Sequence, residues 1–97
     1  MHYERVHNAT SKGFDIVLSF AADESDPNLI ARVQAFFCNV ELASVYLGGC
    51  DYESAQEFVK ESGYFDDMVR EAVQEAEQNL AMLTALAPER GFRDVAP

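Results

Sequence analysis

Four side chains have the types that bind metals or act as nucleophile and base: His2, His7, Cys38 and Cys50. Structural zinc sites use ligands paired at short spacing, but the two cysteines lie twelve residues apart and neither has a second ligand close by. A nucleophilic cysteine or serine also needs a general base, and both histidines lie at the extreme N-terminus. We therefore expect no metal site, no catalytic residue, no cofactor and no enzymatic activity.

The carboxylates are the more informative group. Seventeen Asp and Glu face seven Lys and Arg, which gives a net charge of −10. Such a surface repels nucleic acid and anionic membranes and attracts basic surfaces. Direct binding of DNA or RNA needs clustered Lys and Arg, so we expect a protein partner, no direct nucleic-acid contact and no membrane. The polar residues 1–7 are followed by no apolar leader segment, which favours a cytoplasmic location.

Most of the net charge lies in residues 51–77, where nine acids face only Lys60 and Arg70. The nine acids are Asp51, Glu53, Glu57, Glu61, Asp66, Asp67, Glu71, Glu75 and Glu77. Asp67, Glu71 and Glu75 recur every fourth residue, and on a helix they form a line with steps of about 6 Å. This line is either a solvated face that maintains solubility or a row of charges that imitates a nucleic-acid backbone and fills a basic groove.

The first half of the chain must supply a sheet. Large apolar residues alternate with smaller or polar ones from Phe14 to Phe20, the period of a strand with one buried face. Tyr3–His7 is expected to pair with it through a turn at residues 8–13. A polar loop at residues 23–28 containing Pro27 follows.

A second hairpin is expected after that loop. Its strands carry Val33, Ala35 and Phe37 on the way out and Val40, Leu42, Ser44 and Tyr46 on the return. Cys38-Asn39 is the expected reversal, and Gly48-Gly49 is expected to end the returning strand. The two hairpins predict an antiparallel sheet of three to four strands.

The second half of the chain is typical of helices. Ser54 and Glu57 have the spacing of a capping box, and Gly63 suits the end of a short helix. A longer helix is expected over residues 65–87, ended by Pro88. Its apolar positions recur at spacings of three and four: Phe65, Met68, Val69, Ala72, Val73, Ala76, Leu80 and Leu83. The prediction is one α+β domain over residues 1–87, in which the two helices cover the sheet, and a flexible tail at 88–97.

A resemblance adds to this interpretation. The segment Tyr46–Ser54, then Glu57-Phe58 and residues 63–68, resembles small proteins found on phages and plasmids, a similarity that spans about residues 40–76. In size and charge the whole chain is similar to phage anti-CRISPR proteins. This second resemblance implies a stoichiometric inhibitor inside a bacterial host cell. Its target would be the basic surface of a crRNA-guided surveillance complex, where target DNA enters.

The residues expected to contact such a partner form three sets. The first set is the line of Asp67, Glu71 and Glu75, with Asp66 beside it. Glu53, Glu57 and Glu61 form the second. Tyr52 and Tyr64 form the third, as rim aromatics that anchor the partner; the alternative for both is partial burial at the junction of sheet and helix. Two alternatives remain: a structural or regulatory module that dimerises through an edge strand such as residues 3–7, and a DNA mimic directed at a restriction enzyme or nucleoid protein. A monomer or weak homodimer is expected.

Overall fold

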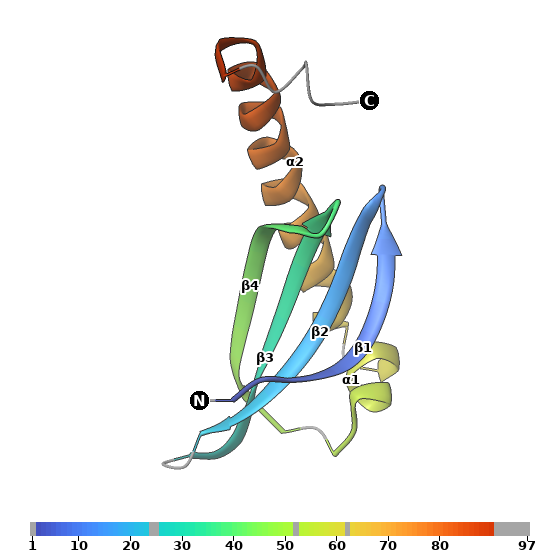
Figure 1. Cartoon of the computed structure of the whole chain (residues 1–97). Coiled ribbons are helices and arrows are strands. Elements are labelled where there is room, and N and C mark those ends of the chain that lie inside the picture. Colours follow the sequence, from blue (N-terminus) through green and yellow to red (C-terminus); the bar gives the residue numbers. More distant parts are fainter. Residues whose placement is uncertain (1, 24–25, 52, 62, 91–97) are drawn as a thin grey trace.

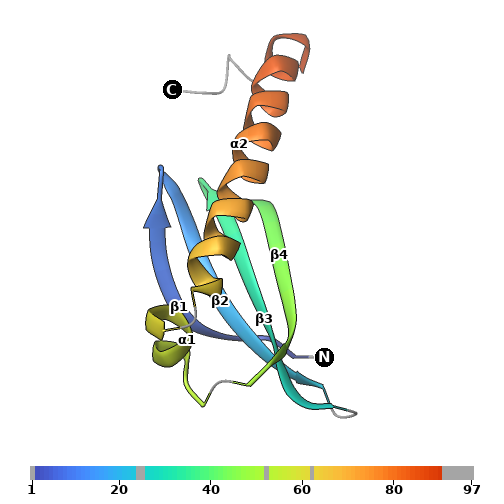
Figure 2. The same cartoon turned by 180° about the vertical axis from the view of Figure 1, so that it is seen from behind.

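The computed structural model describes residues 2–23, 26–51, 53–61 and 63–90. Within them the chain forms β1 (Glu4–Ser11), β2 (Phe14–Asp23), β3 (Asp26–Phe37), β4 (Val40–Cys50), α1 (Ala55–Glu61) and α2 (Tyr64–Arg90). The strands form one antiparallel sheet in chain order, and the two helices lie on the same side of it (Figures 1 and 2). This confirms the predicted α+β architecture of two hairpins followed by a short and a long helix.

Both hairpins close through two-residue turns. Lys12 and Gly13 have φ values of 50° and 86°, and Cys38 and Asn39 have values of 51° and 65°. Positive φ at both central residues matches the right-handed twist of the flanking strands. The reversal at Cys38-Asn39 is confirmed, whereas the turn expected over residues 8–13 is shorter than predicted because β1 continues to Ser11.

The connection between the hairpins is also shorter than the predicted loop at residues 23–28. β2 continues to Asp23 and β3 begins at Asp26, so Pro27 lies inside a strand. The register shifts at this point, from Ala22 paired with Leu29 to Asp23 paired with Asp26. A proline has no N–H to donate to a sheet, and here it falls where regular pairing is interrupted.

The diglycine does not end β4 as expected. Leu47 pairs with Ala31 and Cys50 with Leu29, so β4 has one more residue than β3 between these pairs. Such a bulge is a common place for glycine, and Gly49 adopts a φ of 71°. The bulge allows the strand to continue, and Cys50 turns into the core.

The core lies between the sheet and the helices. From the sheet come Phe14, Ile16, Leu18, Phe20, Ala31, Val33, Ala35, Leu42, Ala43 and Cys50. The helices contribute Phe58, Phe65, Met68, Ala72, Val73 and Ala76. Ala72 and Ala76 are fully buried against the sheet, which shows that small side chains allow α2 to approach it closely. The apolar stripe predicted for the long helix is confirmed up to the partly buried Leu80.

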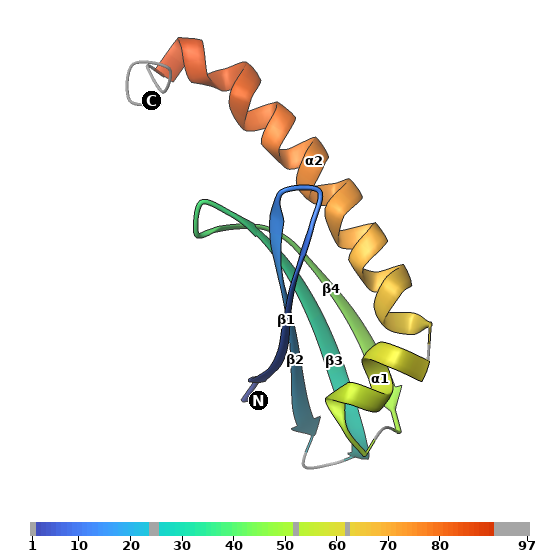
Figure 3. The ribbon, with the colours of Figure 1, turned by 90° about the vertical axis from the view of Figure 1, so that its right-hand side faces the viewer.

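The far end of α2 continues beyond the sheet (Figure 3). Met82 and Leu83 are therefore exposed, and Leu83 does not continue the buried stripe as predicted. The helix runs to Arg90 rather than stopping before Pro88. A proline past the first turn of a helix lacks the N–H for the bond to the carbonyl four residues earlier, and α2 continues only two residues beyond Pro88. The rest of the predicted tail, residues 91–97, lies outside the described residues. No described helix has the length and apolar character needed to cross a membrane.

Candidate functional site: the acidic helical layer

The orientation of α2 is set by the residues it buries. Phe65, Met68, Ala72 and Ala76 face the sheet and are each at most 6% exposed. Asn79 adds a polar contact, because its side-chain amide donates a hydrogen bond to the backbone carbonyl of Leu42. With one face packed this way along three turns, the opposite face of the helix is held toward solvent.

The acidic line, defined as Asp67, Glu71 and Glu75, begins near that opposite face and winds along one flank of α2, and all three side chains are exposed. Four residues advance the helix by about 6 Å and turn it by about 40° past a full revolution. The three carboxylates therefore span about 12 Å along the axis in a gently winding row. The sequence prediction that they share a solvent face is confirmed.

One base interrupts this row of negative charge. The guanidinium of Arg70 lies 3.1 Å from a carboxylate oxygen of Asp67, and both side chains are well exposed, at 74% and 67%. Exposed pairs of this kind contribute roughly 0–1 kcal/mol. A more basic surface can therefore displace Arg70 from Asp67 at little cost. Glu71 and Glu75 have no ion-pair partner among the described residues.

Asp66 is exposed but does not extend the acidic line. It borders a shallow hollow between α2 and the first hairpin turn, together with Lys12, Arg70 and Glu77. Its place in the first turn of α2 also suits the positive end of the helix dipole. A structural contribution is thus sufficient to explain this residue.

The second acidic set lies around α1. Glu53 and Glu61 are exposed and Glu57 is half-buried. The backbone amide of Glu57 donates a 3.2 Å hydrogen bond to the Ser54 hydroxyl, which confirms the predicted serine cap of α1. Figure 3 shows α1 beside the start of α2 on the same side of the sheet, so both acidic sets belong to one helical layer.

Of the two predicted aromatic anchors, Tyr64 is placed by the structure and Tyr52 lies outside the described residues. Tyr64 begins α2, is 51% exposed and borders a shallow hollow lined by residues 47–51 of β4 and the segment after it. An exposed ring at the base of the acidic line is suitably placed to contact a surface that the line meets.

The structure places the two cysteines and His7 apart from one another. No group of three or more His, Cys, Asp or Glu side chains among the described residues is arranged to hold a metal ion. Cys38 is exposed in the second hairpin turn, and Cys50 is buried at the other end of β4. His7 packs its ring edge-on against Phe65, with centroids 5.6 Å apart, which makes it part of the contact between β1 and α2.

The opposite face of the sheet carries a surface that sequence patterning did not indicate. Arg5 pairs with Ser19, and Ser19 pairs with Arg32, so one row crosses the three strands β1–β3. The Arg32 guanidinium lies 4.0 Å from the centre of the Tyr3 ring, and Tyr3 meets Tyr46 edge-on. These residues are far apart in sequence, and only the strand register brings them together.

The chain was compared with known proteins. No family model, no curated protein and no solved structure matches it. The interpretation of both surfaces therefore rests on the residues themselves.

Proposed function

We propose that this protein is a non-enzymatic inhibitor of a bacterial nucleic-acid-binding defence complex, an anti-CRISPR protein that blocks target DNA binding. The single observation that carries the proposal is the acidic line: three exposed carboxylates in a row on a helix whose other face is packed against a sheet. They lie in a segment, residues 51–77, with nine acids and two bases. The partner is a basic surface on a subunit of a crRNA-guided surveillance complex.

The spacing of the acidic line supports a nucleic-acid mimic. Steps of about 6 Å along α2 compare with one phosphate per 3.4 Å along each DNA strand, so the carboxylates meet a groove lined with Lys and Arg at about every second phosphate position. Because the helix is already formed and packed, little ordering is required when it docks. The charge also accelerates encounter, and this acceleration falls as salt increases.

The test is a competition experiment. A purified crRNA-guided complex is mixed with labelled target DNA and increasing amounts of the protein, and DNA binding is followed by fluorescence anisotropy at low and high salt. The test variant carries Asp67→Lys, Glu71→Lys and Glu75→Lys. A matched control reverses three exposed acids of the strands and thereby changes the net charge by the same amount: Glu4→Lys, Asp15→Lys and Glu41→Lys.

The expected result is that the wild type and the control variant inhibit DNA binding, that the acidic-line variant does not, and that all three have the same circular dichroism spectrum. Equal inhibition by the two variants would remove the acidic line from the contact surface. If no surveillance complex is inhibited but a restriction enzyme or a nucleoid protein is, the proposal of a DNA mimic is kept and the proposed target is replaced by that protein.

A second candidate, a self-associating interaction module, is favoured by a different observation. Residues 78–88 contain no charged side chain, and Met82 and Leu83 in this stretch are 62% and 44% exposed beyond the end of the sheet. Two copies approaching through this end would meet least charge repulsion. Sedimentation equilibrium tests this candidate. A dimer whose dissociation constant does not change with salt concentration, and which is lost in Met82→Glu, would support the interaction module over the inhibitor.

A further inference from the structure

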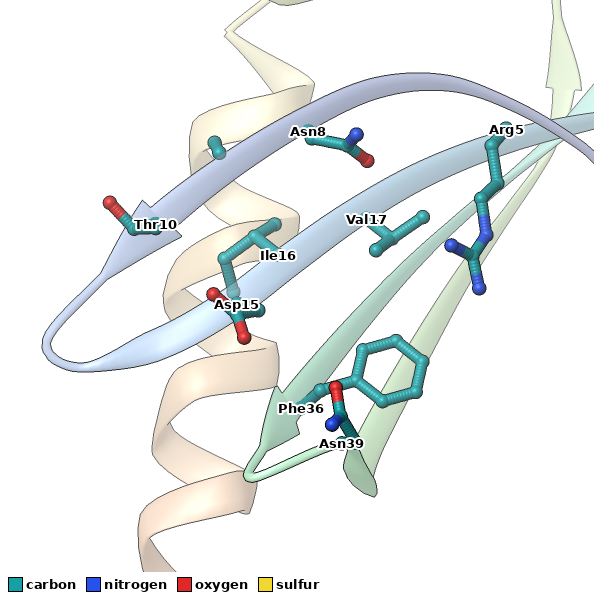
Figure 4. A pocket seen from close by; sticks show the side chains of 9 residues that line it. Arg5, Asn8, Thr10, Asp15, Ile16, Val17, Phe36 and Asn39 are labelled. Atoms are coloured by element: carbon teal, nitrogen blue, oxygen red, sulfur yellow. The ribbon is translucent and has the colours of Figure 1, made fainter.

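The two edges of the sheet differ in what lies beside them. β1 forms one edge and β4 the other, because the strands lie in chain order. α1 packs against β1, and Arg5 of that strand borders a hollow of about 650 Å³ on the sheet face away from the helices (Figure 4). β4 has β3 as its one neighbouring strand within the described part of the chain. Alternate residues of β4 therefore point backbone N–H and C=O groups outward, where no strand pairs with them.

The middle of β4 lacks the side chains that usually protect such an edge. Residues 43–47 lie between the two bulges and pair one by one with β3. They include no charged residue and no proline, whereas natural edge strands are protected from pairing by Lys, other charges or Pro. This segment, the open edge, is regular enough to accept a further strand.

α2 runs antiparallel to β4 beside this edge (Figure 3). Asn79 donates a hydrogen bond to the carbonyl of Leu42 near the start of β4, and Tyr64 borders a hollow lined by residues 47–51 at its end. From Tyr64 to Asn79 the helix advances about 22 Å, and from residue 42 to residue 48 a strand advances about 20 Å. The helix therefore accompanies β4 over the whole length of the open edge.

Two carboxylates of the acidic line lie on the flank of α2 that is next to β4. At 100° per residue, Glu71 and Glu75 each lie within about 20° of Tyr64 around the helix axis. They follow Tyr64 by about 10 and 16 Å along that axis, which places them level with the open edge. The flank that borders the first hairpin turn is on the other side of the helix. Unpaired backbone groups and two carboxylates thus lie side by side.

We infer that the open edge binds an extended segment of a partner protein as an added strand, and that this segment carries Lys or Arg at alternate positions. A strand added to β4 lies about 4.8 Å away and turns every second side chain toward the helices. Those side chains recur about every 6.6 Å, close to the step of about 6 Å between Glu71 and Glu75. Their apolar stems pack on the half-buried Val45, and their charged ends reach the two carboxylates.

A second copy of this chain fits the open edge poorly. Antiparallel pairing of β4 from two copies brings Glu71 and Glu75 of one copy toward the same residues of the other, and like charges repel. A basic segment meets opposite charge at the same place. The inference deepens the function proposed above and rests on it in one respect, that the acidic line meets a basic protein. It adds the sheet edge as the other half of the contact.

The test uses a labelled synthetic peptide of about nine residues, the length of an ordinary strand, in which Lys and Thr alternate. Binding to the full chain is followed by fluorescence anisotropy, and hydrogen exchange of the backbone amides is followed by NMR. The expected result is slower exchange of the outward-pointing amides in residues 43–47, with no change in β1. A control peptide with the same residues in two blocks, all Lys and then all Thr, is expected to bind at least about fivefold more weakly.

Backbone methylation of the peptide tests strand addition without altering the protein. A strand presents the N–H groups of alternate residues to one neighbour, so either the Lys or the Thr amides pair with β4. One peptide is methylated at every Lys nitrogen and another at every Thr nitrogen. One of the two is expected to bind at least about tenfold more weakly, because several hydrogen bonds are lost. The other is expected to stay within about threefold of the unmodified peptide.

A pair of matched variants tests the carboxylates. Glu71→Gln with Glu75→Gln is expected to weaken the peptide about fivefold or more. Asp66→Asn with Glu77→Gln makes the same change of charge at exposed positions on the other flank of α2, and is expected to stay within about twofold. Circular dichroism of the two variants is expected to be identical.

Four results would overturn the inference. They are no peptide binding at about millimolar concentration, equal affinity of the two methylated peptides, equal weakening in the two matched variants, and a dimer of the protein alone in which the amides of β4 are protected. Failure of the peptide with inhibition of DNA binding intact would overturn the inference and leave the proposed function. Strand addition at β4 with no complex inhibited would overturn the proposed function and leave the edge site.

Discussion

Truncation of Phe58 is the sharpest test of how α1 is attached. Phe58 is completely buried and meets Phe20 of β2 and Phe65 of α2 edge-on, with centroid distances of 5.5 and 6.4 Å. Replacing a buried Phe by Ala costs about 3–5 kcal/mol, and the two ring pairs account for about 0.5–1.5 kcal/mol each within that loss. Since domains of this size have about 5–15 kcal/mol in total, Phe58→Ala should remove a large share of the stability.

Urea unfolding followed by circular dichroism measures the effect. Phe58→Ala is expected to lower the free energy of unfolding by about 3–5 kcal/mol and the Tm by at least about 12 °C. Phe58→Leu keeps most of the volume and should lose about 1–2 kcal/mol, mainly the ring pairs. Val40→Ala, at a position 55% exposed, is the control and should stay within about 0.5 kcal/mol. A loss below about 1 kcal/mol in Phe58→Ala would mean that α1 does not dock on the sheet as described.

Three further predictions concern a cap, a bulge and a thiol. Ser54→Ala should cost about 1 kcal/mol in urea unfolding because it removes the cap of α1; no change would show that the cap is not formed. Gly49→Ala should lower the free energy of unfolding by about 1–2 kcal/mol, since the φ of Gly49, 71°, is left-handed. Gly48 has no such φ, so Gly48→Ala should be nearly neutral. Equal losses in the two variants would argue against the bulge. In native protein iodoacetamide should modify the exposed Cys38 and spare the buried Cys50, as mass spectrometry can verify. Burial raises the pKa of the Cys50 thiol from its usual value of 9.0. The neutral buried thiol therefore stabilises the fold fully below pH 9.0, and this stabilisation is lost as the pH rises through the folded-state pKa. Rapid modification of both thiols, or stability that does not decline from pH 8 to 10 relative to Cys50→Ala, would refute this.

The architecture was predictable where periodicity was strong. The alternation from Phe14 to Phe20 and the three-four spacing from Phe65 to Leu80 each have one clear buried face, and the structure buries those faces together. The acidic line followed from the same helical spacing. Boundaries were less predictable because they depend on pairing: β1, with the sequence ERVHNATS, has no clear alternation, and its extent is decided by its partner β2.

Two features had no local signal at all. The bulge at Gly48-Gly49 has the composition of a strand end, and only pairing across from Leu29 and Ala31 shows that β4 continues. The row of Arg5, Ser19 and Arg32 depends on the register of three strands, which sequence patterning did not provide. The cap at Ser54, in contrast, is a local motif and was predicted correctly.

The order of the strands bears on how the chain folds. Each strand pairs with its neighbour in sequence, so few long loops must close before pairing begins and the contact order of the sheet is low. The apolar side of that sheet is covered by α2, which follows it in the chain. During synthesis the sheet side bearing Phe14, Ile16 and Leu18 therefore leaves the ribosome before its cover does. For that interval the nascent chain is a ready substrate for chaperones and prone to aggregation, and its exposure ends when α2 docks.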